Sequence, residues 1–109
     1  MMKKKKGFLF DWTKYVTKHL VTATVEDTAK QDVVLTFDHL YAIKPFRKAV
    51  AGEFTLVGKT VDLLTLDEAT FTVTIHVTVA CAAGAGFNLT FNPTQKGDTV
   101  IIAITNNVA

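Results

Sequence analysis

Residues 70–80 carry the feature that most constrains the fold, a strict alternation that reads T-F-T-V-T-I-H-V-T-V-A. The apolar residues occupy one set of alternate positions. The other set consists of Thr70, Thr72, Thr74, His76 and Thr78. Because successive side chains of a β-strand point to opposite faces, this segment predicts a strand with one face in the core. The threonine side then faces solvent or an interface, and we treat it as a possible interface face.

Other segments alternate in a similar but less regular way, at 15–25, 33–40, 53–57, 60–66, 87–91 and 99–105. Gly58-Lys59 separates two of them and suggests a hairpin turn. A content of 17 threonines and 13 valines also favours strands. About seven short strands in one domain predict an all-β protein. We expect a single antiparallel β-sandwich, jelly-roll or immunoglobulin-like, with a small barrel as the alternative.

One segment interrupts this pattern. Around residues 45–51, Pro45 stands near a possible first helical turn and Gly52 follows the segment, which predicts one short helix. No internal repeat or linker divides the rest of the chain. The expected organisation is therefore a basic and aromatic N-terminal arm at 1–14 and a sandwich domain at 15–109.

Charge is concentrated in the arm. Residues 1–18 contain six lysines and one acid, for a net charge of +5, whereas the remaining 91 residues carry six basic and nine acidic side chains, for −3. The residues that we expect to contact a partner are Lys3, Lys4, Lys5, Lys6, Phe8, Phe10 and Trp12. In an extended chain the three aromatic rings share one side. Such a segment either joins this domain's own sheet, adds to a neighbouring subunit, or remains a solvated tail.

Few residues offer catalytic chemistry. The chain has no serine, and its single cysteine, Cys81, follows an apolar strand, where a buried and inert thiol is expected. The spacing of His19, His39 and His76 does not indicate a metal site. Residues 57–60 resemble the end of a phosphate-binding loop, but no glycine stands five residues before Gly58 and a strand is expected to follow. We expect that the protein is not an enzyme and that it has no catalytic residue, metal or cofactor.

The function expected from these observations is a non-enzymatic structural subunit that self-assembles or decorates a larger assembly. Its most concrete form is a bacteriophage or other viral virion protein, such as a capsid, decoration or tail component, whose arm contacts a neighbouring subunit. The expected partners are other copies of itself or other subunits.

The alternative is a small β-domain that binds nucleic acid through the lysine-rich arm, with Lys44, Arg47 and Lys48 extending the basic surface. No apolar stretch approaches the roughly 20 residues of a membrane span. The apolar run after the lysines covers only residues 7–10, too short for a signal peptide. The expected location is a virion or the cytoplasm of the producing cell.

Overall fold

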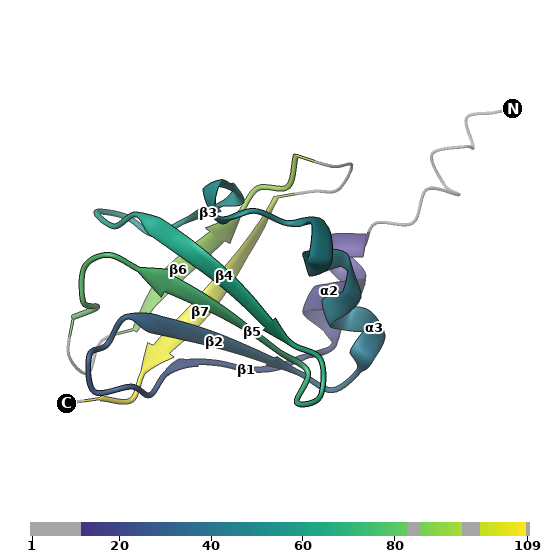
Figure 1. Cartoon of the computed structure of the whole chain (residues 1–109), viewed down its shortest axis with the longest axis horizontal. Coiled ribbons are helices and arrows are strands. Elements are labelled where there is room, and N and C mark those ends of the chain that lie inside the picture. The colour runs from purple at the N-terminus through teal and green to yellow at the C-terminus, as the bar shows by residue number, and fades with distance from the viewer. Residues whose placement is uncertain (1–11, 83–85, 95–98, 109) are drawn as a thin grey trace, which may run out of the picture.

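The computed structural model describes residues 12–82, 86–94 and 99–108 (Figure 1). Its strands are β1 (Leu20–Val25), β2 (Asp32–Phe37), β3 (Phe54–Thr55), β4 (Val61–Asp67), β5 (Thr72–Val77), β6 (Gly86–Phe91) and β7 (Val100–Asn106). Its helices are α2 (Trp12–Lys18), α3 (Leu40–Ile43) and two 3-10 turns, η1 (Lys44–Lys48) and η2 (Ala51–Glu53). The all-β prediction is confirmed.

The seven strands form one sheet in the order β3-β6-β7-β1-β2-β5-β4, which curls into a nearly closed barrel. The expected sandwich is not confirmed, because the strands belong to one sheet. The sheet is also mixed, since β1 and β7 pair in parallel while the other pairs are antiparallel. Alternation is the same in a sandwich and in a barrel, because in both a twisted sheet buries one face. The sequence pattern therefore could not distinguish them.

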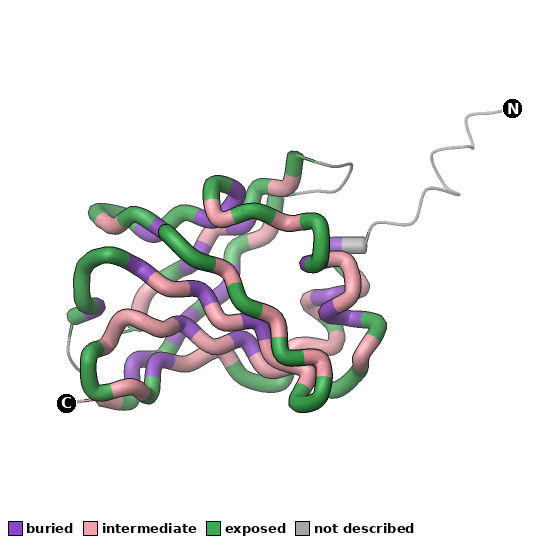
Figure 2. Tube along the Cα trace, in the orientation of Figure 1, coloured by how far each residue is buried: buried purple, intermediate pink, exposed green. Residues whose placement is uncertain are grey.

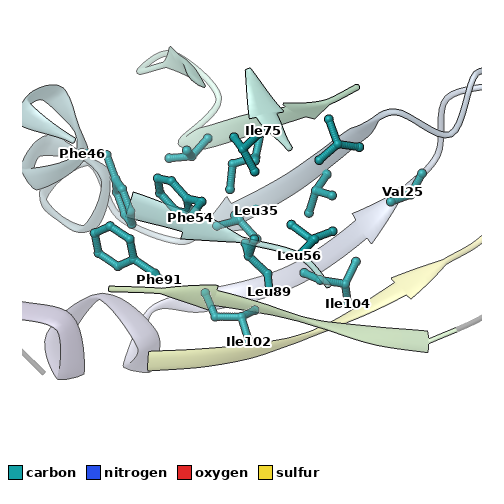
Figure 3. Close-up of a cluster of buried hydrophobic side chains, with 14 of the residues drawn as sticks. Val25, Leu35, Phe46, Phe54, Leu56, Ile75, Leu89, Phe91, Ile102 and Ile104 are labelled. Atoms are coloured by element: carbon teal, nitrogen blue, oxygen red, sulfur yellow. The ribbon is translucent and has the colours of Figure 1, made fainter. Parts of the chain in front are cut away.

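The barrel interior is filled by the inward side chains of the strands. Along β2 and β5 buried residues alternate with partly exposed ones, as Figure 2 shows. Phe54 and Phe91 stack with their ring centroids 4.6 Å apart, and Phe46 lies 5.4 Å from Phe91 (Figure 3). These three rings fill the end of the barrel nearest to the helices.

Two helical segments cover that end, and both depart from the sequence predictions. Residues 12–18 form α2 rather than part of a strand over 15–25, because Thr13 and Val16 lie three positions apart and are both buried. Trp12 is the first residue of α2, so it is not extended. The predicted arm boundary at 14 also falls inside this helix.

The short helix predicted near 45–51 lies earlier in the chain, over α3 and η1, at residues 40–48. His39 ends the preceding strand pattern because its Nδ1 accepts a 3.1 Å hydrogen bond from the backbone N–H of Tyr41, which caps α3. Pro45 occupies the first turn of η1, where its missing N–H costs nothing. No helix in the described part of the chain is long and apolar enough to cross a membrane.

The hairpin predicted around Gly58 is only partly correct. The turn exists, with a bridge between Leu56 and Lys59, but β3 pairs with β6 and β4 pairs with β5. The strand predicted over 70–80 is shorter than expected, because Phe71 adopts a positive φ of 59° and β5 begins at the next residue. Val79, expected inside, is 54% exposed beyond the end of β5.

Candidate functional site

The outward faces of four adjacent strands form a surface rich in threonine. On the central strand β5, Thr74 lies between Val34 of β2 and Thr65 of β4, and Thr72 lies between Thr36 and Asp67. β1 continues both rows. We define the threonine face as the side chains of Thr22, Thr24, Val34, Thr36, Thr65, Thr72 and Thr74.

Among the described residues no charged side chain interrupts this face, and the charges lie at its margins. At one margin Nδ1 of His76 lies 2.6 Å from Oδ1 of Asp62, and Asp32 is the partner of His76 on β2. The hydrogen bond to Asp62 raises the pKa of the His76 imidazole, although partial desolvation opposes this. Asp67 marks the other margin, at the end of β4.

Of the five residues predicted for the interface face, two belong to the threonine face and His76 lies at its margin. Thr72, Thr74 and His76 point outward from β5. Thr70 lies in the β4–β5 turn, and its hydroxyl is 2.9 Å from that of Thr72. Thr78 follows the end of β5 and is exposed. The threonines of β1, β2 and β4 were missed, because alternation within a strand does not identify its neighbours.

Most of the predicted arm lies outside the described residues. This applies to Lys3, Lys4, Lys5, Lys6, Phe8 and Phe10. Trp12 is described as the start of α2. The prediction that these residues contact a partner therefore stays a prediction.

Two of the three histidines lie close together although they are distant in the sequence. His19 and His39 come together with ring centroids 5.7 Å apart, and Nδ1 of His19 lies 2.7 Å from Oδ1 of Asp38. His76 lies at the margin of the threonine face, on β5. Within residues 12–82, 86–94 and 99–108, no three His, Cys, Asp or Glu side chains are placed to hold a metal ion.

Cys81 is 4% exposed, and burial raises the pKa of its thiol, which makes the thiolate less available. It lines a pocket of about 280 Å³ whose other walls are Leu56, Val57, Lys59, Ala82, Gly86, Phe87 and Asn88. The lining of this pocket is largely apolar. The stretch 57–60 that resembled a phosphate-binding loop is a turn leading into β4, with no helix N-terminus to hold a phosphate.

Two pairs of neighbouring carboxylates, Glu26-Asp27 and Asp67-Glu68, lie at turns. Asp27 accepts hydrogen bonds of 3.1 Å from the backbone N–H groups of Gln31 and Asp32. Burial acts to raise the pKa of Asp27, but these hydrogen bonds outweigh it and the pKa is lowered. In the β4–β5 turn, Asp67 accepts a bond from the N–H of Ala69. Both pairs therefore have structural partners.

Comparison with models of protein families and with curated protein sequences found no match. The surfaces described above are thus the basis for a functional proposal.

Proposed function

We propose that this protein is a non-enzymatic structural subunit that self-assembles through its threonine face. Its most concrete form is a virion protein of a bacteriophage or another virus, in the capsid, tail or decorating layer. The observation that carries the proposal is an outward surface of four strands without a charged side chain in its interior. Surfaces that stay in water usually have interspersed charges, about a quarter to a third of their residues.

The chemistry of the threonine face suits a contact that excludes water. Threonine hydroxyls donate and accept hydrogen bonds, so they tolerate partial burial without the large desolvation cost of an ion. Thr72 and Thr74 are already half-buried by their neighbours on the sheet. Their β-branched side chains are also restricted at χ1, so little side-chain entropy is lost when a second surface packs on them.

The area of the threonine face is too small for a standard interface, so a second contact must contribute. With strands about 4.8 Å apart and about 3.3 Å per residue, four strands of about five residues cover roughly 300 Å². A standard interface buries about 800 Å² on each partner. Each aromatic side chain adds about 150–250 Å² when buried, so Phe8 and Phe10 of the arm would supply much of the difference on a neighbouring subunit.

The test is the native mass of the full chain by light scattering after size exclusion, across a range of protein concentrations. The main variant is Thr74→Lys, which places a charge in the centre of the threonine face. Its matched control is Thr90→Lys, since Thr90 is also half-buried and outward on the other side of the barrel, on β6. We expect a defined oligomer for the wild type and the control, and a single-chain mass for Thr74→Lys.

A second variant lacks residues 1–11, which leaves α2 and every described residue in place. We expect it to dissociate at concentrations where the full chain remains assembled. A wild type that is monomeric at all concentrations contradicts self-assembly. An unchanged mass for Thr74→Lys excludes the threonine face as the contact, and an unchanged mass for the truncated chain excludes the arm.

A further inference from the structure

The helical end of the barrel has a basic groove that is separate from the threonine face. The groove has a volume of about 420 Å³ and is lined by Tyr41, Lys44, Pro45, Arg47 and Lys48. Each charged side chain in this lining is positive. We call it the cap groove, because α3 and η1 belong to the helical segment that covers one end of the barrel (Figure 1).

The local backbone explains why these side chains line up. η1 is a 3-10 helix, in which residues three apart lie directly above one another. Tyr41, Lys44 and Arg47 follow each other at this spacing, as the chain passes from α3 into η1. Phe46 points into the core and anchors the segment. The groove is therefore held by a fixed element of the fold.

Tyr41 provides an accessible aromatic surface in the cap groove. It is 58% exposed. Its ring stacks with His39 at 5.1 Å between centroids, and Nζ of Lys44 lies 4.6 Å from the Tyr41 centroid. His39 contacts His19, and His19 contacts Tyr15 of α2, so a row of rings extends from α2 to the groove. A planar ligand that stacks on this exposed ring takes the place of the Lys44 ammonium over it, and the displaced ammonium then stays near the ligand.

The positive charge of the groove is only partly neutralised. Arg47 makes a bidentate ion pair with Glu68, at 2.5 and 2.6 Å. Neither Lys44 nor Lys48 forms an ion pair with any residue that the structure describes. On the neighbouring helix α2, Lys14 and Lys18 are exposed as well. The groove therefore holds an exposed Lys48 and a half-buried Lys44 whose ammonium lies over the Tyr41 ring.

We propose that the cap groove binds single-stranded nucleic acid, with phosphates on Lys44 and Lys48 and a base stacked on Tyr41. A positively charged groove with an aromatic platform is the arrangement by which proteins hold unpaired strands without reading their sequence. An acidic protein segment would use the two lysines but would gain nothing from the ring. This site goes beyond the proposed structural role, because it adds a ligand that the threonine face does not need.

The test is a fluorescence anisotropy titration of a labelled thymidine oligonucleotide of about 20 nucleotides, longer than a typical single site. The full chain is used at several salt concentrations. The variant Lys44→Gln/Lys48→Gln is compared with Lys30→Gln/Lys59→Gln, which removes the same charge at the other end of the barrel. We expect the groove variant to bind roughly tenfold more weakly, with a salt slope smaller by about 1.4, from two lost phosphate contacts.

A second pair of variants tests the ring itself. Tyr41→Leu should weaken binding by about fivefold or more, whereas Tyr41→Phe should keep it within about twofold, because stacking needs the ring and not the hydroxyl. Arg47 stays unchanged in every variant, since its pair with Glu68 joins η1 to the β4–β5 turn. Thermal unfolding of each variant verifies that the fold is intact.

Three results would overturn the proposal. Equal losses in the two double-lysine variants would mean that binding depends on net charge alone. Unchanged binding in Tyr41→Leu would exclude stacking. Tighter binding of a poly-glutamate peptide than of the oligonucleotide, insensitive to Tyr41→Leu, would assign the groove to an acidic protein surface.

Discussion

Glu53 is a buried carboxylate, 5% exposed, and it holds two loops together. Oε1 accepts a 2.8 Å hydrogen bond from the backbone N–H of Val50, and Oε2 accepts bonds of 2.7 Å from the N–H and the hydroxyl of Thr94. Burial acts to raise the pKa of Glu53, but the hydrogen bonds outweigh it, so the pKa is lowered. The ionised form is thus the one that stabilises the fold.

Glu53→Gln should therefore reduce the free energy of unfolding at pH 7 by about 2 kcal/mol, because it replaces charge-assisted bonds and leaves an amide NH₂ facing backbone donors. Because the folded pKa is lowered, the contribution of the carboxylate is complete above the ordinary glutamate pKa of about 4.3 and is lost as the pH falls below it. Urea unfolding of the wild type and of Glu53→Gln, from about pH 7 down to about pH 3, measures how the difference in stability changes around the ordinary glutamate pKa. A difference in stability that stays constant across this range would contradict the assignment.

At the scale of elements, the turn between β3 and β4 depends on one glycine. Gly58 has a φ of 76°, and the N–H of Lys59 donates a 3.0 Å bond to the carbonyl of Leu56. This geometry is that of a type II turn, whose third position favours glycine. A Cβ on Gly58 would meet no atom within 4 Å, so any cost of a side chain there comes from the backbone alone.

Gly58→Ala should lower the free energy of unfolding by about 1 kcal/mol, the cost of a left-handed conformation for a residue with a Cβ. Gly52→Ala is the matched control, because a Cβ there also has open space and its φ is not positive. It should be neutral, or stabilising by up to about 0.5 kcal/mol, since alanine restricts the unfolded chain. Denaturant unfolding of the two variants separates these effects. Equal destabilisation would show that the turn geometry is not the cause.

Sequence alternation was sufficient to locate a strand where that strand has one buried face. The strands predicted over 60–66 and 99–105 are displaced by one residue at both ends from β4 and β7, and the strand predicted over 87–91 begins one residue after β6 does. It failed at α2, where Thr13 and Val16 have helical spacing but were divided between the predicted arm at 1–14 and a predicted strand at 15–25. It also could not give the partner of β3, because alternation identifies a face and not a neighbour.

The candidate surfaces could likewise be predicted only in part from the sequence. The threonines of β5 were visible in the sequence, but the complete threonine face required the register of four strands. The cations Lys44, Arg47 and Lys48 were also visible. Tyr41 was missed as their partner, because residues 33–40 were predicted as one strand and His39 was therefore not identified as the N-cap of α3.

At the scale of the whole molecule, Phe46 joins the helical end to the barrel. Its ring centroid lies 5.4 Å from that of Phe91, 5.9 Å from Phe37 and 6.2 Å from Phe54, so a single side chain of η1 contacts aromatic residues of three strands. It is 1% exposed. The helical segments α2, α3 and η1, which we call the cap, therefore share one hydrophobic core with the barrel and should unfold together.

Phe46→Ala should lower the free energy of unfolding by about 3–5 kcal/mol, through lost burial and the cavity left behind. Against a total of about 5–15 kcal/mol for a domain, this loss is large. Tyr41→Ala, in the same segment but 58% exposed, should cost less than about 1 kcal/mol. Urea unfolding is followed by circular dichroism for the sheet and by the NMR methyl signals of Val16 for the cap. If the two probes give separate midpoints in the wild type, the cap and the barrel do not form one cooperative unit.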